Sequence, residues 1–364
     1  MRILYGVVGE GMGHATRSRV LLDHLVKHHD VHIVVSGRAR DYLAKHFENV
    51  HNIWGFTMSY DGNSVKKLGT VLQNLKGAVS GWPQNIRTYF DLAEQFAPDV
   101  VVSDFESFSY LFAKNHRLPV ISVDNMQVIN RCAHEPSLLA GWERDFDLSK
   151  SIVKAKLPGA FHYLVTTFFR PPVRKARTTL LPPILRPEIL AAKATVGDHV
   201  LVYQSQAGNL ALVDSLKAAK VPMRVYGLRR DLQADVVDGN LTFKPFSEAG
   251  FIDDLRTARG VIAGGGFTLM SECVYLKKPM LTLPLEGQFE QVINALYLEK
   301  LGYGVFAQSL DGAAIESFLE RLADCQRALE SYVQNGNVDM IAALDEQLLK
   351  ARALRGAWQE TTQD

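Results

Sequence analysis

The fold class can be predicted from one segment, residues 261–294, with the sequence VIAGGGFTLMSECVYLKKPMLTLPLEGQFEQVIN. Two short apolar runs, Val261–Ala263 and Met280–Leu283, alternate with the segments Phe267–Leu276 and Glu290–Lys300, which favour helices. Continuous apolar strands that are separated by helices are typical of a parallel sheet covered on both faces. The stretch therefore predicts an α/β domain built on an open parallel sheet.

The same alternation continues outward from this stretch towards both ends of the chain. The other expected strands are Ile3–Val8, Val31–Ser36, Asp99–Ser103, Val120–Val123, Phe161–Phe168, His199–Gln204, Met223–Tyr226 and Leu241–Lys244. Five prolines between Pro171 and Pro187 interrupt the pattern, because proline disfavours helices and central strands alike. The expected organisation is two α/β domains with a cleft between them, at 1–170 and 195–336, a connection at 171–194 and a terminal helical stretch at 337–364.

The composition is that of an ordinary globular protein and excludes several classes. Of the 364 residues, 47% are hydrophobic and 22% charged, and 40 basic against 39 acidic side chains leave a net charge of +1. This balance provides no overall attraction to nucleic acid. Three distant cysteines, Cys132, Cys273 and Cys325, exclude a disulfide framework and a cysteine-built zinc site. Without a signal peptide or an apolar window near 18 residues, we expect a cytoplasmic protein.

The first candidate loop is Gly9-Glu-Gly-Met-Gly-His14, between the first strand and a helix. Glycines such as Gly11 and Gly13 let backbone N–H groups approach an anion at a helix N-terminus. The loop lacks the third glycine of the dinucleotide fingerprint, since His14 stands there, and the Gly-Lys-Ser/Thr of a P-loop. His14 is a candidate general base near neutral pH. The alternatives are a histidine that only caps the loop, and Glu10 as the base.

Asp104 is the expected partner of His14, because both follow strands of one parallel sheet and therefore share its carboxyl edge. A buried carboxylate needs a partner, and accepting the Nδ1–H of His14 fixes the tautomer of the imidazole and raises its basicity. An aspartate that caps the following helix is the alternative. Glu106, two residues on, is interpreted as a first-turn glutamate favoured by the helix dipole.

A third and a fourth loop carry residues suited to a nucleotide sugar. Three glycines after Val261–Ala263 invite close approach by a bulky anion, and Glu272 on the following helix can accept hydrogen bonds from two ribose hydroxyls. Glu290 and Gln291 follow the next strand and offer groups to a hexose. The residues expected around the phosphates are Gly264, Gly265, Gly266, Phe267, Thr268 and, in the third loop, Ser205 and Gln206. A solvated helix position is the alternative for Glu272.

A histidine pair and a lysine-rich segment each allow a functional interpretation and a purely structural one. His24 and His28 have the i, i+4 spacing of a metal pair, but no carboxylate pattern accompanies them, so we expect a solvated helix end and no metal site. Lys66, Lys67 and Lys76 alternate with apolar residues in a basic amphipathic segment. This segment favours a surface helix, with peripheral contact to the inner face of a membrane as the alternative.

These motifs resemble the inverting glycosyltransferases of the GT-B fold, such as the plant UDP-glucosyltransferases and the peptidoglycan N-acetylglucosaminyltransferase. The resemblance covers the whole chain and implies two Rossmann-like domains facing across a cleft, with the helix in 337–364 crossing back onto the first domain. His14 and Asp104 are similar to the catalytic pair of the plant enzymes. The residues similar to donor-binding positions are Ser205, Gln206, Ile252, Gly266, Glu272, Glu290, Gln291 and Asn294.

The sequence departs from this family pattern at two positions. Gly264 stands where the plant enzymes carry a phosphate-contacting histidine, so backbone amides have to take over that contact. Glu290 replaces the aspartate of the sugar-contacting pair and is one methylene longer, so the identity of the sugar does not transfer. The segment Trp54–Gly81, on the expected acceptor side, matches no pattern.

The function that the resemblance implies is transfer of a hexose from a nucleoside-diphosphate sugar, with UDP expected, to a hydroxyl of an unknown acceptor. Lipids and glycans are the acceptors considered, within cell envelope biosynthesis. The nucleotide sugar is a co-substrate, and neither a cofactor nor a metal ion is expected. A sugar-nucleotide epimerase or hydrolase and a non-catalytic nucleotide-sugar-binding protein remain as alternatives.

Overall fold

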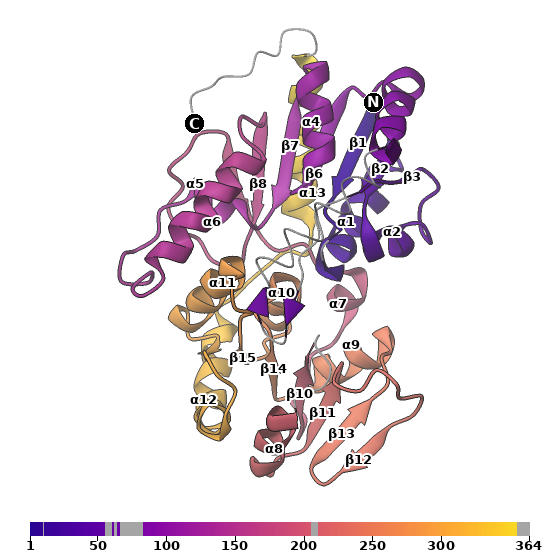
Figure 1. The fold of residues 1–364 in the computed structure, drawn as a ribbon. Helices are drawn as coiled ribbons and strands as arrows, with labels where there is room; N and C mark the ends of the chain where they lie inside the picture. Colours follow the sequence, from indigo (N-terminus) through magenta and orange to yellow (C-terminus); the bar gives the residue numbers. More distant parts are fainter. Residues whose placement is uncertain (10, 55–59, 62–63, 66–82, 205–209, 355–364) are drawn as a thin grey trace. The chain divides into compact units, whose positions relative to one another are not determined.

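The computed structural model describes residues 1–9, 11–54, 60–61, 64–65, 83–204 and 210–354 (Figure 1). The chain divides into two compact units. The first comprises Met1–Tyr60, Lys66–Arg186 and Asn335–Asp364, and the second comprises Asp61–Val65 and Pro187–Gln334. Two short strands, β4 (Tyr60–Asp61) and β5 (Ser64–Val65), make a separate two-stranded sheet. Over the described residues, no helix is both long and apolar enough to cross a bilayer.

The first unit is built on a seven-stranded parallel sheet with the order β3-β2-β1-β6-β7-β8-β9. Its strands are β1 (Arg2–Val7), β2 (Asp30–Val35), β3 (Val50–Asn52), β6 (Val100–Asp104), β7 (Val120–Asp124), β8 (His162–Thr166) and β9 (Thr178–Leu181). The central strands β6 and β7 are buried at every position, as expected for a sheet covered on both faces. All seven strands run parallel, so their carboxyl ends lie at one edge of the sheet.

Helices cover both faces of this sheet (Figure 1). They are α1 (Met12–Leu25), α2 (Gly37–Leu43), the helical residues 83–91, the π-helix η1 (Leu92–Phe96), α4 (Ser107–His116), α5 (Gln127–Arg131), α6 (Glu143–Lys156) and, from the far end of the chain, α13 (Val338–Ala353). Helix α13 places Met340, Leu344 and Leu348 in the same hydrophobic core as β1. The C-terminal helix is therefore part of the first unit.

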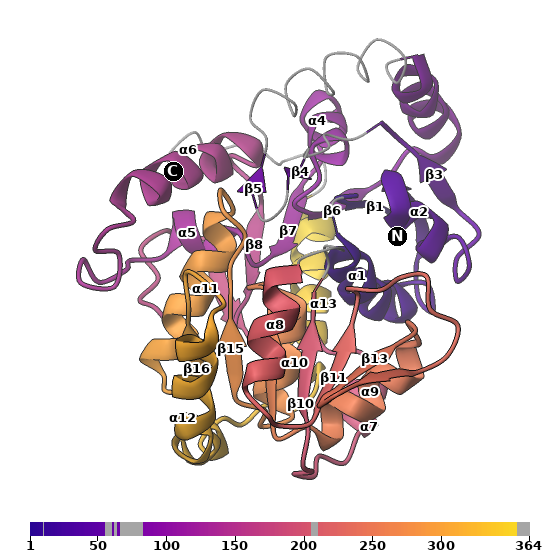
Figure 2. The same ribbon diagram turned by 60° about the horizontal axis from the view of Figure 1, so that its bottom comes forward.

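The second unit has a sheet of its own, with the order β12-β13-β11-β10-β14-β15-β16 (Figure 2). The strands are β10 (Val200–Tyr203), β11 (Met223–Tyr226), β12 (Val236–Asp238), β13 (Leu241–Lys244), β14 (Gly260–Ala263), β15 (Met280–Thr282) and β16 (Gly304–Phe306). Only the edge pair β12–β13 is antiparallel among these strands. The helices of this unit are α7 (Pro187–Ala191), α8 (Leu210–Ala218), α9 (Glu248–Thr257), α10 (Phe267–Tyr275), α11 (Phe289–Lys300) and α12 (Gly312–Glu330).

The prediction of an α/β protein with two parallel-dominated sheets is confirmed. One difference concerns the expected connection 171–194, which contains strand β9 and helix α7, so that the first unit extends to Arg186. The prolines that suggested an irregular connection flank β9 rather than interrupt it, and β9 is an edge strand that pairs on one side only. The proline content therefore led to a predicted irregular connection where the structure has an edge strand.

Candidate active site

His14 and Asp104 meet at the carboxyl edge of the first sheet, as their positions after β1 and β6 predicted. His14 stands in the first turn of α1, whose preceding residue, Gly11, has φ of +83°, a conformation that favours glycine. Asp104 is the last residue of β6 and is buried. The His14 Nδ1 atom lies 2.9 Å from Asp104 Oδ1.

Two residues that the sequence analysis missed complete the surroundings of Asp104. Arg17 donates from Nε to Asp104 Oδ2 at 3.0 Å and from Nη2 to Oδ1 at 2.5 Å, and Ser18 Oγ donates to Oδ2 at 3.0 Å. Both residues are buried. The signal in the sequence was the spacing: Arg17 and Ser18 follow His14 by three and four positions, which places all three on one face of a helix.

The charge of Arg17 changes the electrostatics of the pair. Burial alone raises the pKa of the Asp104 carboxyl, but the Arg17 guanidinium and His14 outweigh it and hold that pKa below its ordinary value. The pKa of His14 is lowered, first by burial and then by Arg17, while Asp104 acts in the opposite direction. His14 is therefore held in its neutral form at neutral pH, which is the form that can accept a proton.

Two neighbours compete for Nδ1 of His14. Arg17 Nη2 lies 2.7 Å from this nitrogen, and Asp104 Oδ1 lies 2.9 Å from it. A neutral imidazole nitrogen either donates or accepts, so only one of these contacts is a hydrogen bond at a time. When Nδ1–H donates to Asp104, Nε2 carries the lone pair and is able to act as a base. When Arg17 donates to Nδ1, Nε2 carries the proton instead.

Asp104 and Glu106 are two residues apart, and their carboxylates have different hydrogen-bond partners. Glu106, not Asp104, caps α4: its carboxylate accepts from the backbone N–H groups of Phe108 at 2.7 Å and Ser109 at 2.6 Å. The intervening Phe105 has φ of +56°, a strained conformation for a bulky side chain. The capping alternative for Asp104 is thus excluded, and the interpretation of Glu106 as a residue at the helix start is supported.

In the second unit, the three glycines between β14 and α10 turn out to have different environments. A Cβ atom on Gly265 would lie 2.7 Å from Gln291 Cβ and 2.9 Å from the Gln291 carbonyl oxygen, whereas a Cβ on Gly266 would have no heavy atom within 4 Å. A Cβ on Gly264 would make ordinary contacts. Gly265 therefore has a packing role, since it lets α11 approach the loop, and its contact with a ligand stays a prediction.

The other expected donor-binding residues of this unit vary in exposure. Glu272 is only 2% exposed, which excludes its interpretation as a solvated helix residue, and Ile252 and Phe267 are buried as well. Thr268 and Glu290 are half-buried. Gln291 uses its amide within the loop before α11: Oε1 accepts from the Leu285 N–H at 3.0 Å, and Nε2 donates to Gln288 Oε1 at 2.5 Å.

Two groups of residues from the sequence analysis remain: those outside the described part of the chain, and the pair His24 and His28. Glu10, Ser205, Gln206 and the lysine-rich segment around Lys66 lie outside the described part of the chain. His24 Nε2 lies 3.0 Å from both carboxylate oxygens of Asp345 on α13. Within the described residues, no group of three or more His, Cys, Asp or Glu side chains is arranged to hold a metal ion.

Comparison with solved structures places this fold in a class. The structure is similar to that of Phytolacca americana UGT2 complexed with UDP-2fluoro-glucose and pterostilbene, with a TM-score of 0.64 and 13% identity over 96% of this chain and 99% of that one. Neighbours of this kind have the GT-B fold of glycosyltransferases, so the chain has that fold.

The family follows from the sequence itself. A family model described as glycosyl transferase family 1 matches residues 1–323, so the chain belongs to this family and the predicted resemblance is confirmed. An uncharacterized glycosyltransferase of Methanosarcina mazei is 25% identical over 84% of this chain and 85% of its own length. A Bacillus cereus UDP-N-acetylglucosamine--N-acetylmuramyl-(pentapeptide) pyrophosphoryl-undecaprenol N-acetylglucosamine transferase is 32% identical over 28% of this chain and 30% of its own.

Proposed function

We propose that this glycosyltransferase moves a hexose from a UDP-sugar to a hydroxyl of its acceptor, with inversion at the anomeric carbon. The observation that carries the proposal is the pair of His14 and the buried Asp104, 2.9 Å apart at the carboxyl edge of the first sheet. Open parallel sheets bind their ligands at this edge. The UDP-sugars in the names of the Phytolacca and Bacillus proteins support the choice of donor.

In the proposed step, His14 Nε2 accepts the proton of the acceptor hydroxyl while the hydroxyl oxygen attacks the anomeric carbon. The new bond from oxygen to the anomeric carbon forms as the bond from that carbon to the diphosphate oxygen breaks, and UDP leaves with the electron pair. Attack from the side opposite the leaving group inverts the configuration. Asp104 stabilises the imidazolium that forms, against the opposing charge of Arg17.

In the second unit, the proposed donor contacts follow from the start of α10. Backbone N–H groups at a helix N-terminus favour a diphosphate, and Gly266 leaves room there for close approach. Glu272 is assigned to the ribose, Ile252 to the base, and Glu290 with Gln291 to the hexose. Because the backbone N–H groups around residues 264–268 and Ser205 are proposed to stabilise the leaving diphosphate, the proposed chemistry needs no metal ion.

We also place this reaction in cell envelope biosynthesis on the cytoplasmic side of the membrane, with a lipid-linked or glycan acceptor. Support comes from the Bacillus relative, whose name contains a pyrophosphoryl-undecaprenol acceptor. Contact of the protein with the membrane surface is part of this proposal.

The test is a panel of nucleotide sugars, followed by thermal unfolding and by product analysis. A donor that binds the native state raises the melting temperature by mass action. We expect UDP-sugars to produce the largest shift, and the product to have the opposite anomeric configuration to the donor. A retained configuration, or complete turnover of the sugar without any acceptor, would contradict the proposal and favour a hydrolase or epimerase.

A further inference from the structure

Two histidines on neighbouring strands of the first sheet contact each other. His32 lies on β2 and His51 on β3, and His51 Nε2 is 2.9 Å from His32 Nδ1. Their rings are stacked, with centroids 4.9 Å apart, and both side chains are half-buried. In such a contact one nitrogen donates and the other accepts, and an imidazole nitrogen accepts only in the neutral ring. The hydrogen bond therefore exists as long as at least one of the two rings is neutral.

His32 also anchors a helical segment that precedes β6. Residues 83–91 are helical and continue directly into the π-helix η1, so that residues 83–96 form one segment. Phe96, at its C-terminal end, is 4% exposed, and its ring stacks on His32 with centroids 3.8 Å apart and planes 10° apart. Single π-helical turns are rare and are frequently found at functional sites. The stack on His32 thus joins the end of the segment 83–96 to β2.

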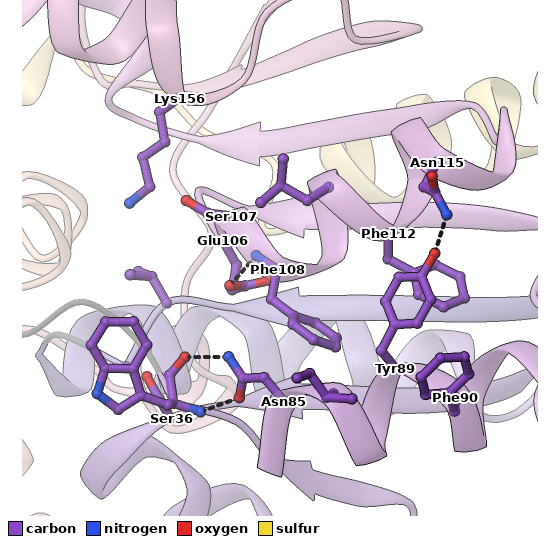
Figure 3. Close-up of a pocket in the computed structure, with 15 residues that line it drawn as sticks. Ser36, Asn85, Tyr89, Phe90, Glu106, Ser107, Phe108, Phe112, Asn115 and Lys156 are labelled. Carbon is purple, nitrogen blue, oxygen red and sulfur yellow. Dashed lines mark hydrogen bonds between the residues drawn. The ribbon is translucent and has the colours of Figure 1, made fainter. Parts of the chain in front are cut away.

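The segment 83–96 contributes one wall of a cavity of about 660 Å³ (Figure 3). Two of its lining side chains, Ile86 and Phe90, are 52% and 55% exposed, so they bury little apolar surface. Segments with few buried apolar contacts open at a lower free energy than the core of a domain. The position of this cavity wall therefore depends on the contact at Phe96 and on the hydrogen bonds of the segment.

Those hydrogen bonds come from Asn85 and Tyr89. The Asn85 side-chain amide accepts from the Trp54 N–H at 2.6 Å and donates to the Trp54 carbonyl oxygen at 3.0 Å. The Tyr89 hydroxyl contacts His116 Nε2 at 2.9 Å and accepts from the Asn115 side-chain amide, as drawn in Figure 3. The segment is thus tied to the chain just after β3 and to α4, where His116 is a further titratable group that faces it.

The charges around the histidine pair favour two neutral rings at neutral pH. Burial lowers the pKa of both His32 and His51, and the charge of His51 lowers the pKa of His32 further. Asp30 on β2 acts on His32, and Asp91 in the segment acts on His51, both in the opposite direction. An opened segment leaves the histidines with their ordinary pKa of 6.5, so the open form binds protons more readily. The stability of the closed form therefore falls as the pH drops below 6.5.

We propose that His32 and His51 form a pH-sensitive latch, which keeps the segment 83–96 closed against β2 and β3 while at least one ring is neutral and releases it when both rings are protonated. One charge is tolerated, because a cation over an aromatic face, such as that of Phe96, is attracted to it. The second charge removes the acceptor of the hydrogen bond and places two like charges at the 2.9 Å contact. Release moves the cavity wall whatever the cavity holds, so the inference is independent of the proposed glycosyl transfer.

The test is hydrogen exchange of the full chain, followed by mass spectrometry of peptides that cover residues 83–96. Rates at pH 5.0 and 7.5 are corrected for the intrinsic pH dependence of amide exchange. We expect the segment to exchange at least about tenfold faster at pH 5.0, since it loses a hydrogen bond and gains a repulsion. His51→Gln supplies an amide that donates to His32 or accepts from it and does not titrate, so the acid response should fall to about twofold or less.

Two further variants locate the acid response. His24→Gln removes a histidine of the same unit that pairs with Asp345 on α13, and it should keep the full response. His116→Gln removes the histidine that contacts Tyr89 and should also keep it, because the latch is intact. A response that is lost in His116→Gln but kept in His51→Gln would overturn the proposal. Equal acceleration of all peptides of the first unit at pH 5.0 would overturn it as well.

A measurement on the wild type needs no variant. In an NMR titration of the imidazole signals, His32 and His51 should titrate below 6.5, in coupled steps that coincide with the rise in exchange. Titration of either ring at or above 6.5, or unchanged exchange of the segment at pH 5.0, would overturn the latch. None of these experiments measures turnover, so a failure of the latch and a failure of the proposed function are observed separately.

Discussion

The carboxyl edges of the two sheets are built in opposite ways. At the edge of the first sheet, charged and polar side chains gather around one buried carboxylate: His14, Arg17 and Ser18 all contact Asp104. At the edge of the second sheet, the loop before α10 carries three glycines and presents backbone instead. The first arrangement suits proton transfer, whereas the second suits the approach of an anion to backbone N–H groups. This difference is the reason for proposing the chemistry at the first edge and the donor at the second.

The largest expected effect comes from the first edge. We expect His14→Ala to lower turnover by about 10²–10⁴-fold, the usual contribution of a general base, and to leave UDP affinity unchanged. The measurement is kcat with a demonstrated acceptor, beside calorimetry with UDP. His24→Ala, on the same helix α1 but paired with Asp345, is the control and should retain turnover. Near-normal turnover in His14→Ala would show that another residue is the general base, and Glu10 is the next candidate.

At the second edge, the expected effect is on binding rather than on rate. Glu272→Gln keeps the size of this buried side chain and removes its charge, so we expect UDP affinity to fall by about ten- to a hundredfold. Calorimetry with UDP measures the change, and an unfolding curve establishes that the variant folds. Glu316→Gln, on α12, serves as the matched control. Unchanged UDP affinity in folded Glu272→Gln would contradict its assignment to the ribose.

A pair of glycine variants separates packing from ligand space within the second edge. Gly265→Ala brings a Cβ against the backbone of Gln291, and we expect a loss of about 1–3 kcal/mol in the free energy of unfolding. Gly266→Ala meets no atom of the protein, so its stability should change little while UDP affinity falls. Urea unfolding and calorimetry on both variants test the separation. If Gly266→Ala binds UDP normally, the diphosphate does not lie against this loop.

The smallest expected effect is a shift of the pH profile. Because protonated His14 is inactive as a base, kcat/KM should fall as the pH drops through the pKa of His14. Burial and Arg17 lower this pKa, so the fall should lie below the ordinary histidine value of 6.5. Asp104→Asn removes the group that raises the pKa, and the profile should move further towards acid. A profile centred above 6.5 in the wild type would contradict the lowering of the His14 pKa by burial and Arg17.

The sequence predicted those parts of the molecule that depend on local pattern. The apolar runs identified the central strands of both sheets, and placing His14 and Asp104 at strand ends was enough to bring them together, because parallel strands share an edge. Arg17 was missed because its spacing from His14 indicates a shared helix face but does not identify Asp104, 87 residues away, as its partner. The packing role of Gly265 was missed for a similar reason: its neighbour, Gln291, is 26 residues away in the sequence. Tertiary contacts decided both cases.

Helix α13 has a consequence for the order in which the chain is made. Its buried face, with Met340, Leu344 and Leu348, completes the hydrophobic core of a unit whose other elements end at Arg186. During synthesis, the 148 residues from Pro187 to Gln334 (334 − 187 + 1) are therefore added before α13 exists. Until then, the part of the first sheet that α13 covers has no helix packed on it. Every residue of the second unit, Asp61–Val65 and Pro187–Gln334, precedes α13 in the chain. The second unit is therefore synthesised completely before the hydrophobic core of the first unit can be completed.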